Sequence, residues 1–203
     1  ETMINLISLL GSKVKLVKKT KKIEILNNNK LNTFVPYKLV KTMRAGVLVL
    51  GPLLARYNKA KVSLPGGCAI GSRPVDLHLE ALKKMGVSFK IRGGYINAVA
   101  KNGLIGNKIT FPKISVGATE NIMLAACLAK GKTILNNCAC EPEIKDLSRF
   151  LVKMGCKIKW LEKRKIEING VTNLKPLIHR VMFDRIEAGT YMIASAVTDG
   201  RIK

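Results

Sequence analysis

Acidic and aromatic residues are scarce in this chain of 203 residues. It has 13 Asp and Glu against 36 Lys and Arg, and only five Phe, four Tyr and one Trp. The shortage of aromatics leaves few rings on which nucleic-acid bases could stack, and no helix-turn-helix, zinc-finger or RNA-recognition motif is present. We therefore interpret the net charge of +23 as a solvated basic surface. A nucleic-acid-binding or purely structural role is kept as an alternative hypothesis.

Long apolar runs are also missing. The longest apolar stretch, Ala45 to Ala55, is far shorter than the roughly 20 residues of a membrane-spanning helix, and Gly51-Pro52 interrupts it. No basic and apolar leader opens the sequence. These features predict a cytoplasmic protein that does not enter a membrane. With 47% hydrophobic and 24% charged residues, the chain should fold around one core, or one core and part of another.

Cysteine and histidine are too few, and too irregularly spaced, for a disulfide framework or a zinc site. The five cysteines are an odd number without a repeated C-x-x-C pair, and only two histidines are present. We therefore expect a reducing compartment, no metal and no cofactor. The cysteines are Cys68, Cys127, Cys138, Cys140 and Cys156.

An internal repeat organises the sequence. The segments that start at Leu6, Ala81 and Phe150 align on Gly11, Gly86 and Gly155, which are roughly 70 residues apart. In each, apolar residues three and four apart precede the glycine, which predicts a helix that ends there. Alternating apolar residues follow, which predicts a hairpin that turns within KKTKK, RGG or EKR.

A second helical pattern lies upstream in each repeated unit, before the segments at Ala81 and Phe150 and again near the end of the chain. It lies at residues 38–58, 117–131 and 187–200, and Gly131 and Gly200 repeat the spacing of Gly86 and Gly155. The final copy has barely begun at Lys203, and Glu1 falls inside the first copy. We therefore expect both ends of the chain to cut through a repeat.

One loop has the composition of a reactive site. Cys68 directly follows Gly66-Gly67, where the backbone can bend, and Arg73 lies five residues further on. An accessible thiol near a guanidinium has a stabilised thiolate. Cys127, by contrast, lies in an apolar run that is typical of a buried structural cysteine.

The repeat and several motifs together resemble one family. The motifs LVKTMRA, LPGGCAIGSRPVDLH, ISVGATENIML, EPEI and DRIEAGT are similar to those of the UDP-N-acetylglucosamine enolpyruvyl transferases. The resemblance covers essentially the whole chain. It implies an α+β fold of repeated βαβαββ units, the inside-out α/β barrel of the enolpyruvyl transferases, here incomplete. Residues 1–183 would be part of a first domain and 184–203 the truncated start of a second, with the active site in the cleft between the two domains.

The resemblance also implies an activity. Members transfer the enolpyruvyl group of phosphoenolpyruvate to the 3'-hydroxyl of UDP-N-acetylglucosamine and release phosphate, which is the first committed step of peptidoglycan synthesis. Cys68 matches the loop cysteine described as a general acid that can form an adduct with phosphoenolpyruvate. The positions that match substrate contacts are Arg44, Arg73, Pro74, Val75, Asp76, Leu77, Lys113, Ile114, Ser115 and Val116.

Alternatives stay open for several of these positions. A related enzyme, 3-phosphoshikimate 1-carboxyvinyltransferase, uses shikimate 3-phosphate, but the cysteine loop and the sugar-nucleotide segments argue against it. Taken alone, Arg44 could be a charge on a helix face and Ser115 a helix N-cap. His78 is expected to be a helix-packing residue with a hydrogen-bond partner. Hinge or structural roles are expected for Glu141, Glu143, Asp184, Arg185 and Glu187.

The match to the family is incomplete. The family's N-terminal lysine-asparagine pair is expected before Glu1, and its carboxylate base and further phosphate-binding arginines beyond Lys203. Phe183 stands where a proline is expected before Asp184, which would alter the stiffness of the hinge. We therefore expect the isolated chain to be inactive unless a longer chain supplies the second domain.

Overall fold

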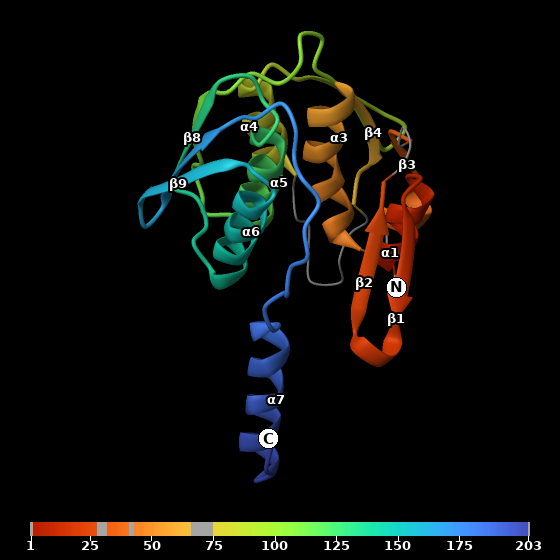
Figure 1. Cartoon of the computed structure of the whole chain (residues 1–203), viewed down its shortest axis with the longest axis vertical. Coiled ribbons are helices and arrows are strands. Elements are labelled where there is room, and N and C mark those ends of the chain that lie inside the picture. Colours follow the sequence, from red (N-terminus) through yellow and green to blue (C-terminus); the bar gives the residue numbers. More distant parts are fainter. Residues whose placement is uncertain (1, 28–31, 41–42, 66–74, 203) are drawn as a thin grey trace.

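A computed structural model describes residues 2–27, 32–40, 43–65 and 75–202. The chain forms two complete copies of one unit, part of a third copy before them, and a single helix after them (Figure 1). Within the described residues, no helix is both long and apolar enough to cross a membrane.

The elements follow the predicted repeat. The partial first unit has α1 (Thr2–Leu9), β1 (Lys13–Val17), the 3-10 helix η1 (Lys18–Thr20) and β2 (Lys22–Leu26). The second unit has β3 (Phe34–Val35), α2 (Tyr37–Val40), the 3-10 helix η2 (Arg44–Val49), α3 (Leu50–Tyr57), β4 (Lys59–Ser63), α4 (Asp76–Lys84), β5 (Ser88–Arg92) and β6 (Tyr95–Val99). The third unit along the chain, which is complete like the second, has β7 (Lys108–Thr110), α5 (Val116–Ala126), β8 (Lys132–Asn136), α6 (Pro142–Lys153), β9 (Lys157–Glu162) and β10 (Lys165–Asn169). Helix α7 (Arg185–Thr198) follows it.

The two complete units have the same sheet topology. Their strand orders are β3-β4-β6-β5 and β7-β8-β10-β9. In each sheet the first pair is parallel and the other two pairs are antiparallel. The repeat predicted from the sequence is thereby confirmed, as is the α+β class.

Three glycines end the helices at the predicted places. Gly11, Gly86 and Gly155 have φ values of 107°, 90° and 102°, and they lie directly before the hairpins β1–β2, β5–β6 and β9–β10. A residue with a side chain is strained at such φ values, whereas glycine is not. These positions set where each helix stops and in which direction the following strand leaves.

In the second and third units, the helices α3, α4, α5 and α6 lie between the two sheets (Figure 1). Helix α5 is buried on several sides because it packs against α3, α4 and α6. Its sequence is apolar almost all round, as a fully enclosed helix requires. Its buried residues are Ala118, Thr119, Asn121, Ile122, Met123, Ala125 and Ala126.

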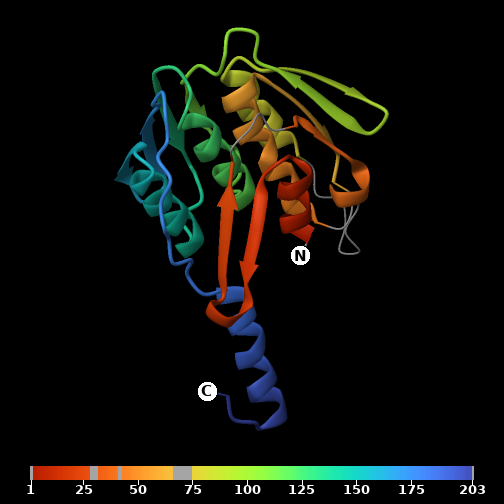
Figure 2. The ribbon, with the colours of Figure 1, turned by 45° about the vertical axis from the view of Figure 1, so that its right-hand side comes forward.

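The first hairpin is much less covered than its two counterparts. Leu16 and Ile23 pair across β1 and β2 and are 49% and 53% exposed. Ile96 in β6 and Ile166 in β10, which correspond to Ile23, are completely buried, whereas Ile91, which corresponds to Leu16, is 58% exposed. Within the described residues β2 pairs only with β1, and Figure 2 shows the hairpin projecting from the body. The apolar side chains of β2 therefore lack the packing that those of β6 and β10 have.

The last helix is also uncovered. Residues 171–184 run along the third unit, where the amide of Lys175 donates to the carbonyl of Met154, and α7 then projects away from the body (Figure 1). None of the residues of α7 is buried.

Candidate functional site

Three of the segments predicted to bind substrate lie at the beginnings of helices. Arg44 begins η2, Asp76 begins α4, and Val116 begins α5. Helices α4 and α5 meet near these starts, because a Cβ built on Gly117 would lie 3.5 Å from Cε1 of His78. Helix α5 also packs against η2. The structure therefore brings the predicted segments 75–77 and 113–116 close together, with η2 packed against the same central helix.

The start of α5 is a capped helix terminus. The hydroxyl of Ser115 accepts a hydrogen bond from the amide of Ala118 at 3.2 Å. The Thr119 hydroxyl donates to the carbonyl of Ser115 at 2.7 Å and accepts from the amide of Ala139 at 3.0 Å. Ser115 is thus an N-cap, as one of the two sequence interpretations held, and the cap fixes the direction of the segment that precedes it.

The residues before this cap face solvent. Lys113 and Ile114 are exposed, and Val116 is half-buried. The exposed Lys113 lies close to the positive end of the α5 dipole, so this region favours a negatively charged group.

The start of α4 is arranged differently. Val75 is buried, Asp76 is exposed and Leu77 is half-buried. Among the described residues no side chain caps this helix, and the amides of His78 and Leu79 bond to the carbonyl of Val75. Segment 75–77 therefore offers backbone and one exposed carboxylate, rather than a basic side chain, to anything that binds here.

His78 fits the prediction of a packed histidine. It is 4% exposed, and its Nδ1 lies 3.0 Å from the side-chain nitrogen of Asn121. Asn121 was not singled out in the sequence, although a polar residue inside the apolar run NIMLAAC was a signal for it.

Part of the predicted site lies outside the described residues. This applies to Cys68, Arg73 and Pro74, and to the side chain of Arg44. Their roles stay predictions. Of the cysteines that the structure describes, Cys127, Cys138 and Cys156 are buried and Cys140 is half-buried, so the burial expected for Cys127 is confirmed. Burial raises the pKa of the Cys138 thiol to about 11.

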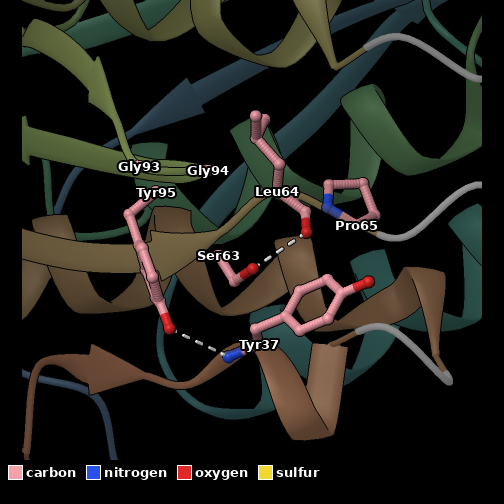
Figure 3. A pocket seen from close by; sticks show the side chains of 7 residues that line it. All are labelled: Tyr37, Ser63, Leu64, Pro65, Gly93, Gly94 and Tyr95. Atoms are coloured by element: carbon pink, nitrogen blue, oxygen red, sulfur yellow. Dashed lines mark hydrogen bonds between the residues drawn. The ribbon is translucent and has the colours of Figure 1, made fainter.

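A shallow pocket lies where the chain enters the segment 66–74. Its volume is about 480 Å³, and Figure 3 shows the rings of Tyr37 and Tyr95 at its sides, with Ser63, Leu64, Pro65 and the Gly93-Gly94 turn completing the lining. The amide of Tyr37 donates to the hydroxyl of Tyr95 at 3.3 Å. The ammonium group of Lys61 lies 5.1 Å from the centre of the Tyr95 ring. The pocket wall is thus held together by contacts between α2, β4 and β6.

Comparison with known proteins places this fold and these motifs in one family. The model of the family described as EPSP synthase (3-phosphoshikimate 1-carboxyvinyltransferase) matches residues 1–203. The chain belongs to the EPSP synthase family. The chain is 64% identical over 204 residues to a UDP-N-acetylglucosamine 1-carboxyvinyltransferase of Pelagibacter ubique, covering 100% of this chain and 48% of that protein. It is 50% identical over 202 residues to the protein of the same name from Endomicrobium trichonymphae, with 100% and 48% covered.

Solved structures show the same fold at low identity. The enolpyruvyl transferase NikO of Streptomyces tendae superposes with a TM-score of 0.81 at 18% identity, covering 96% of this chain and 46% of that one. An EPSP synthase of Acinetobacter baumannii gives 0.73 at 19% identity, covering 97% and 44%. The enolpyruvyl transferase fold predicted from the sequence is confirmed. The chain spans about half the length of the curated relatives it matches.

In this family member, an ion pair joins the first residue of α7 to α6. Arg185 donates to both carboxylate oxygens of Glu143, at 2.7 and 2.9 Å. The hydrogen bonds from Arg185 lower the pKa of Glu143. Burial, and then the charge of Glu143, raise the pKa of Glu120 on α5. The structural roles expected for Glu143 and Arg185 are thus visible as a bidentate pair.

Two further contacts strengthen this junction. Asp184 is the N-cap of α7, because its carboxylate accepts from the amides of Ile186 and Glu187 at 2.8 and 3.2 Å. The carboxylate of Asp146 lies 3.1 Å from Nε2 of His179, a contact that the sequence did not reveal because the two residues are 33 positions apart. Glu141 accepts from the amide of Cys140 at 2.7 Å, which is again a structural role.

Proposed function

We propose that this chain is part of an enzyme that transfers the enolpyruvyl group of phosphoenolpyruvate to the 3'-hydroxyl of UDP-N-acetylglucosamine and releases phosphate. The observation that carries the proposal is the 64% identity, over the whole chain, to a relative named for this reaction. The EPSP synthase structure shares the fold at only 19% identity. The alternative that uses shikimate 3-phosphate is therefore less well supported.

The described helix starts fit a role in binding the sugar nucleotide. Segments 75–77 and 113–116 lie close together, and the second combines an exposed lysine with a positive helix end. A diphosphate carries the charge that such a place favours. In this proposal Arg44 and Arg73 add guanidinium groups that suit phosphate and carboxylate oxygens.

The similarity of the loop around Cys68 to the family motif supports a chemical role for this cysteine. We propose that its thiol donates a proton to the methylene carbon of phosphoenolpyruvate. The adduct would form when the thiol adds across the carbon–carbon double bond, so that sulfur bonds to the carbon bearing the phosphate and the thiol proton goes to the methylene carbon. Because the chain spans about half the length of its relatives, the remaining catalytic groups are proposed to come from a second domain that begins near Asp184. Cytoplasmic location likewise stays a prediction.

Binding of UDP-N-acetylglucosamine to this chain tests the proposal. Calorimetry should compare UDP-N-acetylglucosamine with UDP and with inorganic polyphosphate, since the net charge of +23 alone attracts polyanions. We expect weak binding that is tighter for the sugar nucleotide than for UDP. Equal affinity for all three would mean that the chain binds anions only through nonspecific electrostatic attraction. It would support the alternative in which the basic surface has a nucleic-acid-binding or structural role.

Thiol labelling tests the assignment of Cys68. We expect a small alkylating reagent to modify Cys68 first in the folded chain, because Cys127, Cys138 and Cys156 are buried. Mass-spectrometric mapping gives the order of modification. Modification of Cys127 or Cys156 before Cys68 would count against a reactive loop thiol.

A further inference from the structure

Asn121 is a polar residue at the centre of the most enclosed helix. Its side chain is completely buried on α5, among neighbours such as Ile122 and Ala125 that are equally buried. A buried amide costs free energy unless its donors and acceptor find partners. The partners of Asn121 therefore show what this amide contributes in place of an apolar side chain.

Asn121 has three partners, each on a different element. Its Oδ1 accepts from the amide of Gly51 on α3 at 2.8 Å. Its Nδ2 donates to the carbonyl of Val47 on η2 at 3.2 Å, and also to Nδ1 of His78 on α4 at 3.0 Å. One side chain on α5 thus bonds to α3, η2 and α4.

These partners fix the orientation of the amide. A reversed amide would turn its NH2 group toward the donor amide of Gly51 and its oxygen toward the carbonyl oxygen of Val47, losing both bonds. With the amide in its observed orientation, Nδ1 of His78 must be the acceptor. The neutral His78 ring therefore carries its proton on Nε2, which faces Gly117 near the start of α5.

The backbone of α3 is shaped to reach this amide. A Cβ added at Gly51 would lie 2.4 Å from both the backbone oxygen and Oδ1 of Asn121. Only glycine permits this approach without a shift of the two helices. The contact is thus a specific junction between helices, which a longer side chain at position 51 would force apart.

We propose that Asn121 is a positioning residue that fixes η2 and α4 relative to α5, and thereby aligns the three segments that bind the sugar nucleotide. This inference rests on the proposed function for the identity of the ligand. Val47 lies three residues after Arg44, and His78 directly follows segment 75–77. The third segment, 113–116, leads into α5 itself. Arg44 and segment 75–77 therefore lie within one helical turn of a residue that bonds to Asn121. Segment 113–116 is continuous with α5, the helix that carries Asn121.

Replacement of Asn121 by leucine removes all three bonds while keeping a similar volume. It removes the Asn121 bond from the Gly51 amide, the Val47 carbonyl and Nδ1 of His78, although the Val47 carbonyl still accepts from the amide of Leu50. The loss of a hydrogen-bond partner in a buried site is costly. We expect Asn121→Leu to weaken binding of UDP-N-acetylglucosamine by about tenfold or more, measured by calorimetry on the folded 203-residue chain.

A matched control separates positioning from a general loss of buried polarity. Thr133 on β8 is completely buried, and its hydroxyl has no hydrogen-bond partner within the described residues. Thr133→Val should leave the affinity within about twofold, since it breaks no hydrogen bond. If Asn121→Leu is folded and binds as tightly as Thr133→Val, the positioning role is wrong.

Two readouts do not depend on the ligand. In the unmodified chain, ¹⁵N spectra should show His78 protonated on Nε2 and not on Nδ1, and a proton on Nδ1 would overturn the bond to Asn121. In Asn121→Leu, amide exchange should speed up in both η2 and α4, whereas Thr133→Val should leave these elements unchanged. Faster exchange in neither element would also overturn the proposal.

A second pair of variants applies if Asn121→Leu does not fold. His78→Gln keeps an acceptor for the Asn121 amide, and His78→Leu does not. We expect His78→Gln to bind UDP-N-acetylglucosamine more tightly than His78→Leu, and equal affinities would contradict the role of this bond. If the unmodified chain does not bind the sugar nucleotide, the proposed function fails, and the tautomer and exchange data alone decide whether Asn121 joins the segments.

Discussion

Helices α5 and α7 occupy the same place in successive repeats but have opposite surroundings. Met123 on α5 is completely buried, whereas Met192, its counterpart on α7, is 64% exposed. Both helices have a similar apolar content and begin with a side-chain N-cap, Ser115 or Asp184. The comparison shows that the repeat in the sequence specifies the helix itself, whereas burial depends on neighbouring elements that α7 lacks among the described residues.

The largest difference between the two helices should appear when the paired methionines are shortened. Met123→Ala leaves a cavity among buried side chains, so we expect a loss of about 2–5 kcal/mol in the free energy of unfolding. Met192→Ala removes atoms that already face solvent, so we expect a change within about 0.5 kcal/mol. Urea unfolding measures both. Equal losses would mean that α7 is packed in solution.

A smaller effect is expected from adding a methyl group to α3 where it touches α5. In Gly51→Ala the new Cβ would lie 2.4 Å from two oxygens of Asn121, so the helices must separate. Overpacking of this kind typically costs about 1–3 kcal/mol. Urea unfolding would detect it, and an unchanged midpoint would show that the two helices can move apart without cost.

The attachment of α7 should depend on pH, unlike the packing of α5. The pKa of Glu143 is lowered by its bonds to Arg185, so the pair stabilises the junction above the ordinary pKa of a glutamate and loses this contribution as pH falls through the lowered pKa. Energy transfer from Trp160, the single tryptophan, to an acceptor at Val197→Cys would report the position of α7, with Cys68 and the half-buried Cys140 both replaced by serine.

We expect the distribution of distances from Trp160 to α7 to broaden in acid, as pH falls through the lowered pKa of Glu143. Glu143→Gln should produce the broad distribution already at neutral pH. A distribution that does not change with pH, or with this substitution, would mean that Glu143 and Arg185 do not hold the junction.

The smallest expected effect is an increase in the stability of helix α7. A Cβ at Gly189 meets nothing within 4 Å, so Gly189→Ala should raise the helix stability of α7 by about 0.5–1 kcal/mol, through propensity alone. Amide exchange within α7 is the measurement. Slower exchange in α7 with no change in α5 is expected, and slower exchange in both helices would show that the two are coupled.

The structural features that depend on neighbouring residues could be predicted from the sequence. Glycines at positions 11, 86 and 155 and the alternation around Lys159 were enough to place helix ends and hairpins. The N-cap role of Ser115 was also recognisable, because a cap bonds within its own helical turn.

Contacts between distant residues were not predictable in this way. The bonds of Asn121 to Val47 and Gly51 join residues 74 and 70 positions apart, and the contact of Asp146 with His179 joins α6 to a segment without regular structure. A single sequence records that these residues are polar but not which partner each one meets. The identity of the substrate came from resemblance to a family, because the motifs by themselves were compatible with ordinary capping and packing.

The uncovered hairpin has a consequence for the behaviour of the chain in solution. Among the described residues, β1 and β2 pair only with each other, beside exposed Leu16, Ile23 and Ile25. Such a strand edge is a template on which a second molecule can add strands. The hairpin and its turn also carry Lys13, Lys15, Lys18, Lys19, Lys21 and Lys22, so two copies that approach through this edge repel each other. Salt screens this repulsion, and light scattering should therefore show self-association that increases with ionic strength. The charge of these lysines therefore opposes association of two molecules through an aggregation-prone strand edge.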